Sequence, residues 1–136
     1  MRVVLAAAVA CTSLVGLVAA QEGRPSGSVV LGQDSLSMTW LGSCWEKFCS
    51  DGPGMFFEWD SLGITEFSTS PGSVVTVVYD RLPDRIVISS GGGARGSESD
   101  GVIRLPEEAG LYDFRITARW EEGTVLEGFR ARIVER

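Results

Sequence analysis

An alternation of apolar and polar side chains near the C-terminus constrains the fold of this chain more than any other feature. Successive side chains of a β-strand point to opposite faces of a sheet, so a period of two residues predicts a strand with one buried face. The first alternating run covers residues 111–120. A second, 124–134, follows the turn residues Glu121-Glu122-Gly123, and together the two runs predict a long hairpin. Its expected inward residues are Tyr112, Phe114, Ile116, Ala118, Trp120, Phe129, Ala131 and Ile133.

The remainder of the chain reads as short β-rich runs divided by clusters of Gly, Pro, Asp and Ser. No stretch keeps an apolar period of 3.6 residues over three turns, which argues against helices. Seven or eight strands in a single domain over residues 28–136 predict an all-β fold, an immunoglobulin-like antiparallel β-sandwich. The further strands are expected at 29–31, 37–41, 65–68, 73–79, 85–89 and 102–105.

The N-terminal segment has the layout of a secretory signal peptide. Arg2 precedes an apolar run, and the small residues of 18–20 offer a cleavage site, so residues 1–20 are expected to be removed and 21–27 to form a flexible lead-in. An uncleaved anchor and lipidation at Cys11 are alternatives, although the apolar run continues well past Cys11. The expectation is a secreted or cell-envelope-associated protein with no transmembrane span after cleavage.

Two cysteines remain beyond that segment, Cys44 and Cys49. Outside the cell disulfides persist, so a bond between them is expected, stabilising the protein by about 2 kcal/mol in the loop-closure model. They enclose a candidate binding loop, because aromatic side chains on a rigid loop are typical of interaction hot spots. The alternative is that Trp45 or Phe48 folds inward and caps the sandwich. The loop consists of Trp45, Glu46, Lys47 and Phe48.

Composition argues against several function classes. The chain has no histidine, so catalysis by Ser-His-Asp or Cys-His groups is excluded and the commonest metal ligand is missing. A net charge of −6 repels phosphate backbones, so no nucleic-acid partner is expected. We therefore expect a protein that is not an enzyme, with no catalytic residue, cofactor or metal ion.

Some charged residues leave weaker possibilities open. Asp51, Glu58 and Asp60 could offer oxygen ligands to calcium, but their spacing fits no EF-hand loop. Paired carboxylates could serve glycoside hydrolysis, although nothing in the sequence places two of them across a cleft. The hairpin's expected outer face carries a basic stripe that could meet an anionic partner or simply be solvated. The carboxylates in question are Glu66, Glu98, Glu107 and Glu108, and the stripe is Arg115, Arg119, Arg130 and Arg132.

Two segments resemble known proteins. The run 108–114 resembles the corner that opens strand F of bacterial immunoglobulin-like domains, which implies that the Tyr112 hydroxyl bonds to the chain a few residues upstream. Phe114 stands where antibody-type domains carry their second cysteine. The stretch 105–134, with the Ser-Cys-Trp segment 43–45 and Cys49, is similar to small exported proteins and lipoproteins of spore-forming Gram-positive bacteria. This chain departs from the lipoproteins in lacking a clear lipidation box.

The function expected from these features is a non-catalytic binding or interaction module with a protein or cell-envelope ligand. The alternative is a secreted inhibitor of an extracellular hydrolase such as a protease, because a short rigid loop loses little entropy on binding. A glycan-active hydrolase that uses two carboxylates is a third possibility.

Overall fold

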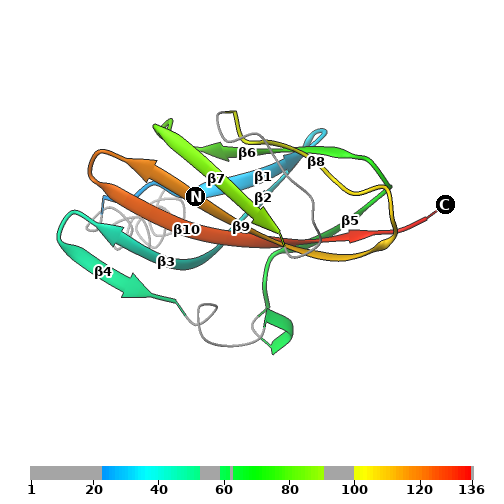
Figure 1. Cartoon of the computed structure of the whole chain (residues 1–136), viewed down its shortest axis with the longest axis horizontal. Coiled ribbons are helices and arrows are strands. Elements are labelled where there is room, and N and C mark those ends of the chain that lie inside the picture. Colours follow the sequence, from blue (N-terminus) through cyan, green and yellow to red (C-terminus); the bar gives the residue numbers. More distant parts are fainter. Residues whose placement is uncertain (1–22, 53–58, 62, 91–99, 136) are drawn as a thin grey trace, which may run out of the picture.

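The protein is a sandwich of two β-sheets (Figure 1). Its structure, a computed structural model, describes residues 23–52, 59–61, 63–90 and 100–135. The expected signal peptide, residues 1–20, lies outside the described residues. The expectation of an all-β sandwich is confirmed.

The smaller sheet has four strands, and every neighbouring pair is antiparallel. Their order across the sheet is β2 (Asp34–Ser37), β1 (Gly27–Leu31), β6 (Val74–Tyr79) and β8 (Val102–Arg104).

The larger sheet has six strands. Five of them follow the order β4 (Phe48–Asp51), β3 (Thr39–Trp45), β10 (Gly123–Ile133), β9 (Gly110–Trp120) and β7 (Arg85–Ser90). The sixth, β5 (Glu66–Thr69), pairs in the parallel sense with the last residues of β10, beyond Gly128, where the pairing of β10 with β3 stops. A short 3-10 helix, η2 (Trp59–Ser61), precedes β5.

The C-terminal hairpin predicted from the alternation is confirmed. β9 and β10 pair along their whole length, and Phe114 lies directly opposite Phe129 with the two rings stacked 5.0 Å apart. Of the eight residues expected to face inward, seven are buried and Tyr112 is half-buried against the core. The core between the sheets is therefore built largely on this hairpin.

The structure has ten strands in the described residues, not seven or eight. The two additional strands, β2 and β4, lie at sheet edges and are exposed at every position. A strand with no buried face carries no apolar alternation, so the pattern in the sequence could not reveal them. One pairing in the larger sheet is not antiparallel, because β5 runs parallel to β10.

Strand β1 begins at Gly27, one residue before Ser28, where the domain is expected to start from the sequence. Pro25 is buried and β1 begins at Gly27, so the sandwich includes residues from the segment expected as a lead-in. A Cβ atom at Gly27 would lie 2.5 Å from Met38 and 2.7 Å from Tyr79. The absence of a side chain is therefore what lets β1 enter the sandwich at this point.

A second, smaller core lies on the outer face of the larger sheet. The register between β10 and β3 shifts after Leu126, which leaves Leu41 as the extra residue of a β-bulge. Leu41 packs there with Leu126, and Trp59 and Ile64 cover both. The segment around η2 is therefore held against the back of the sheet.

Candidate functional site

The disulfide expected between Cys44 and Cys49 lies in the β3–β4 hairpin. The two residues are directly opposite each other in register, and their sulfur atoms are 2.09 Å apart. Trp45 and Phe48 form the next pair, so only Glu46 and Lys47 make the turn. Glu46 has a φ of 57°, a conformation that glycine normally supplies in such turns. The disulfide thus closes a turn of two residues.

The two aromatic residues of the candidate binding loop differ in exposure: Trp45 is buried and Phe48 is exposed. Trp45 is 5% exposed, and its ring meets Trp120 edge-on with the ring centres 5.7 Å apart. It belongs to the core and is not available to a partner, as the inward alternative for the loop anticipated. Phe48 is 78% exposed.

Sheet width explains why Phe48 is uncovered. Residues paired across an antiparallel ladder share a face, so Phe48 points to the same side of its sheet as the buried Trp45. β4 is the outermost strand of the larger sheet and stands apart from the smaller one in Figure 1. The inner face of β4 therefore extends beyond the edge of the smaller sheet, and no core residue covers the Phe48 ring.

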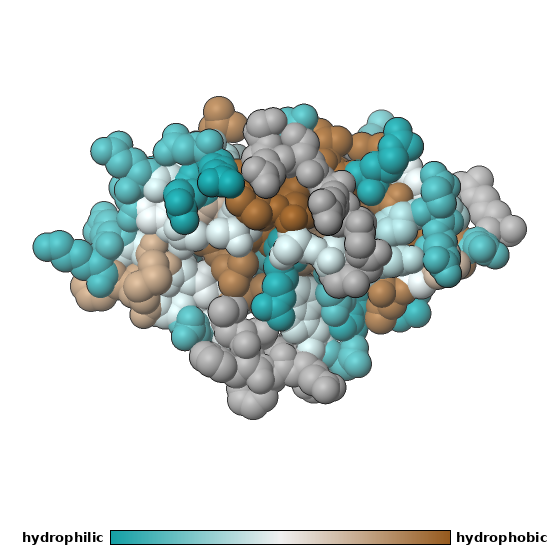
Figure 2. Space-filling view, viewed as in Figure 1, coloured by the Kyte–Doolittle hydropathy of each residue, from teal (hydrophilic) through white to brown (hydrophobic). Residues whose placement is uncertain are grey.

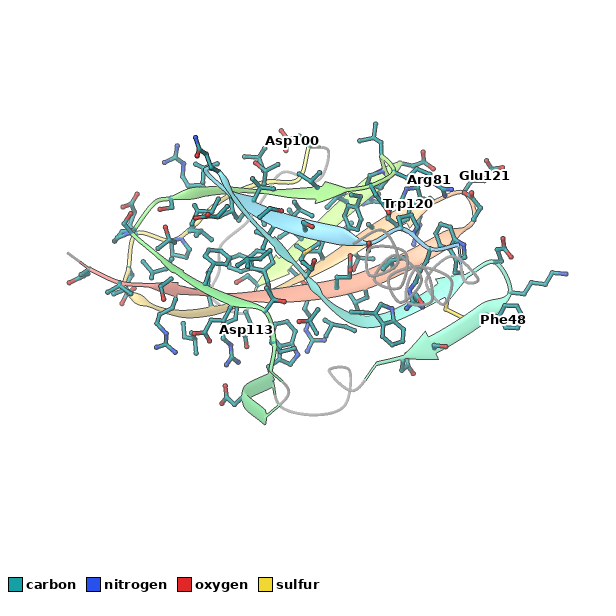
Figure 3. All side chains as sticks on the ribbon, turned by 180° about the vertical axis from the view of Figure 1, so that it is seen from behind. Phe48, Arg81, Asp100, Asp113, Trp120 and Glu121 are labelled. Atoms are coloured by element: carbon teal, nitrogen blue, oxygen red, sulfur yellow. A yellow bond between two sulfur atoms is a disulfide. The ribbon has the colours of Figure 1, made fainter. Side chains whose placement is uncertain are left out.

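Hydrogen bonds and ion pairs join the β3–β4 turn to two other connections at this end of the sandwich. The Glu46 amide donates to the Glu122 carbonyl at 2.7 Å, which ties it to the β9–β10 turn. Arg81, in the β6–β7 connection, forms an ion pair with Glu122 at 2.9 Å and lies over the Trp45 ring. The Trp120 indole donates to the Arg81 carbonyl at 3.1 Å. Figure 3 shows Arg81, Glu121 and Phe48 at this one end.

Leu82 is the residue at this end that sequence reasoning missed. It is 87% exposed, which is more than any other large apolar side chain in the described residues, and Phe48 is second. The only signal in the sequence was a leucine placed between Arg81 and Pro83 inside a polar turn. We call this end the tip surface, and define it as Glu46, Lys47, Phe48, Leu82 and Glu121, all of them exposed.

Two hollows open elsewhere on the described surface. One, of about 200 Å³, lies on the outer face of the larger sheet beside the disulfide, lined by Cys44, Asp51 and Leu126 among others. The other, of about 290 Å³, opens between β1–β2 and β5 against Val29 and Phe67. Ligand pockets usually measure roughly 300 to 1,000 Å³, so both hollows are small for a ligand of that kind.

Tyr112 has the geometry that the resemblance implied. Its hydroxyl donates to the backbone carbonyl of Glu108, four residues upstream, at 2.9 Å. The bond ties the start of β9 to the connection that precedes it. Tyr112 therefore has a structural part in this fold.

The basic stripe is not a free cationic face. The Arg130 side chain is nearly buried, and its guanidinium forms ion pairs with Asp113 of β9 and Asp60 of η2. These partners raise its pKa above the ordinary value, the hydrogen bond to Asp113 first among them. Arg132 pairs with Glu66 at 3.4 Å, and Arg115 lies over the Trp59 ring.

The carboxylates singled out from the sequence do not form a metal centre in the described part of the chain. Asp60 is engaged by Arg130, while Asp51 lies on the exposed strand β4. Glu58 and Glu98 lie outside the described residues. Across residues 23–52, 59–61, 63–90 and 100–135, no three His, Cys, Asp or Glu side chains gather closely enough to hold a metal ion.

A buried carboxyl group that sequence reasoning did not identify lies between the sheets. Glu127 is 3% exposed and accepts a long hydrogen bond, 3.4 Å, from the Gly27 amide of β1. Its other oxygen, the Tyr79 hydroxyl and the Trp40 indole N–H are all buried without a hydrogen-bond partner of standard geometry among the described residues. The only signal was a glutamate at an inward position of the alternating run 124–134.

Burial raises the pKa of Glu127 to about 7, from an ordinary value of 4.5. The Gly27 amide and the positive charge of Arg24 act in the opposite direction, and Asp80 adds to the rise. Burial also raises the pKa of Tyr79. Glu127 is therefore a carboxyl group whose charge changes close to neutral pH.

Comparison of the chain with protein-family models, curated proteins and solved structures found no match. Among the helices that the structure describes, none has the length and apolar character needed to cross a membrane.

Proposed function

We propose that this protein is a non-catalytic interaction module that acts outside the cytoplasm and binds its partner through the tip surface. The observation that carries the proposal is the placement of Phe48 and Leu82. They are the two most exposed large apolar side chains of the described residues, and both lie at the same end of the sandwich. Burying such side chains against a partner removes apolar area from water, which is the main driving force of association.

The rigidity of this end supports the same proposal. Phe48 follows a turn of two residues closed by the disulfide, and Leu82 follows Arg81, which is held by Glu122 and Trp120. Side chains that are already fixed lose less conformational entropy when a partner binds. The extracytoplasmic location rests on the signal-peptide pattern of residues 1–20 and on the oxidising conditions that a disulfide needs.

Site-directed photocrosslinking tests the proposal. A photoreactive amino acid in place of Phe48 should give a discrete covalent adduct with a component of the producing cells' envelope or medium. The matched control is position 134, because Val134 is an exposed apolar residue (48%) at the opposite end of the sandwich (Figure 1). The same adducts from both positions, or none from position 48, would contradict the proposal.

The alternative is an inhibitor of an extracellular hydrolase, and the pinned turn is the observation that favours it. Glu46 and Lys47 protrude on a hairpin tip whose two strands are joined by the disulfide. An inhibitory tip should slow a protease in a panel of secreted hydrolases, with Lys47→Ala relieving the inhibition. A binding module without inhibitory action leaves every hydrolase in that panel at full activity.

A further inference from the structure

The outer face of the smaller sheet is apolar although it is exposed. Four valines that point outward from three strands, Val30, Val74, Val78 and Val102, surround Thr76. Val74 and Val78 are each nearly half exposed. The other outward positions of this sheet are three serines and Arg104.

The sequence of β6 is typical of a strand that is covered on both sides. Its first five residues, 74–78, are Val-Val-Thr-Val-Val, whereas a strand with one face in water normally alternates with polar residues. Within β6 of the single chain, only Val75, Val77 and Tyr79 are buried. The outward valines therefore lack the cover that this pattern indicates.

The charge of the face indicates what covers it. The chain has 18 Asp and Glu residues and a net charge of −6, yet none of the nine outward strand positions of this sheet holds a carboxylate. Two copies of an acidic protein repel each other wherever their carboxylates meet. This face is one on which a second copy can approach without that cost.

From the apolar character, the charge and the register we infer that the outer face of the smaller sheet docks onto the same face of a second copy of this chain. Two such faces would pack sheet against sheet, about 10 Å apart. Val30, Thr76 and Val102 form one row across three strands. A two-fold axis along that row makes the contact self-complementary.

The same two-fold axis brings valine against valine and keeps like charges apart. Val74 and Val78 lie at equal distances on either side of Thr76 along β6, so Val74 of one copy lies over Val78 of the other. Arg104 lies two residues from Val102 along β8, so the Arg104 side chains of the two copies lie on opposite sides of the axis and do not face each other.

The size of the face predicts a weak, reversible dimer. Four short strands about 4.8 Å apart, each about five residues long, present a face of roughly 300 Å². Stable protein interfaces bury about 800 Å² on each partner. Association is therefore expected only towards high protein concentration.

Sedimentation velocity over a concentration series tests the inference. The apparent mass of the wild-type protein should rise from that of the monomer towards twice that value, and Val78→Lys should keep the protein monomeric throughout. Val134→Lys is the matched control, since Val134 and Val78 are equally exposed (48% and 47%), and it should dimerise like the wild type. A wild-type protein that stays monomeric, or equal dimerisation of Val78→Lys, overturns the inference.

Cysteine crosslinking tests the docking independently, without placing a lysine in β6. Two copies of Thr76→Cys face each other at the axis with their backbones about 10 Å apart, which is too far for a direct disulfide but within the span of a short bismaleimide. That reagent should join them into a covalent dimer, whereas Thr117→Cys, half-buried on the outer face of the other sheet, should not be crosslinked. Equal crosslinking of the two variants, or none, contradicts the docking. Phe48→Ala should dimerise normally, so this inference and the proposed function can fail separately.

Discussion

At position 127 the fold places a carboxyl group between inward positions of β10 that hold Val125 and Phe129. Burying a charge without a full set of partners is costly, and the group responds by taking up a proton. The raised pKa of Glu127, about 7, has a consequence for stability that follows from its sign. The folded protein binds a proton more tightly here than the unfolded chain does.

Stability should therefore fall as the pH rises from about 4.5 through 7. Below that window Glu127 is protonated in both states, and above it the folded protein contains a buried carboxylate; the full loss is on the order of 3 kcal/mol. Denaturant unfolding at pH 5 and pH 8 measures the loss. Glu127→Gln keeps the shape without the charge, so the variant should lose less stability over this window than the wild type. An identical loss in both proteins would show that Glu127 does not titrate in the window.

At the scale of elements, the ion pairs of Arg130 join three parts of the chain. Its guanidinium lies between β9 and η2 while its backbone belongs to β10, so it fastens the segment around Trp59 to the back of the larger sheet. Arg130 has little exposed surface and its partners lie on two elements, which sets it apart from a surface ion pair.

Arg130→Ala should destabilise the protein by about 1–3 kcal/mol, because Asp113 loses a partner that holds both of its oxygens. Arg132→Ala is the control, since Arg132 is half exposed and its contact with Glu66 is long; its effect should stay below about 1 kcal/mol. Thermal denaturation compares the two variants. Equal destabilisation would mean that the ion pairs of Arg130 do not fasten η2 to the sheet.

The elements that sequence could predict are those with one buried face. β9 and β10 follow from their alternation, and β6 follows from its valines. β2 and β4 do not, because an exposed edge strand has no apolar period. The pairing of β5 with β10 is also absent from the pattern, since periodicity reports which face is buried and not which strand lies alongside.

The candidate site could be predicted in part. The disulfide followed from two cysteines five positions apart, and the pinned loop followed with it. Which aromatic residue is exposed depends on the sheets having different widths, because Trp45 and Phe48 point to the same side and only Trp45 is covered. Leu82 and Glu127 needed the three-dimensional arrangement, since each has an ordinary sequence neighbourhood.

At the scale of the whole molecule, the proposed binding and the proposed dimerisation involve separate surfaces. The tip surface lies at one end of the sandwich. The outward valines of the smaller sheet, Val30, Val74, Val78 and Val102, form a second surface, which we call the valine face. The hydropathy view in Figure 2 shows apolar residues reaching the surface among mostly hydrophilic ones. A dimer through the valine face would leave the tip surface of each copy open, so one assembly could present two binding ends.

The affinity of the tip surface for the partner that crosslinks at position 48 is the most direct test of the proposed binding function. Isothermal titration with purified partner should show that the double variant Phe48→Ala/Leu82→Ala binds at least about tenfold more weakly, the loss expected on truncating an interaction hot spot. Its melting temperature should match the wild type, because both side chains are almost fully exposed. Unchanged affinity with an unchanged melting temperature would contradict the claim.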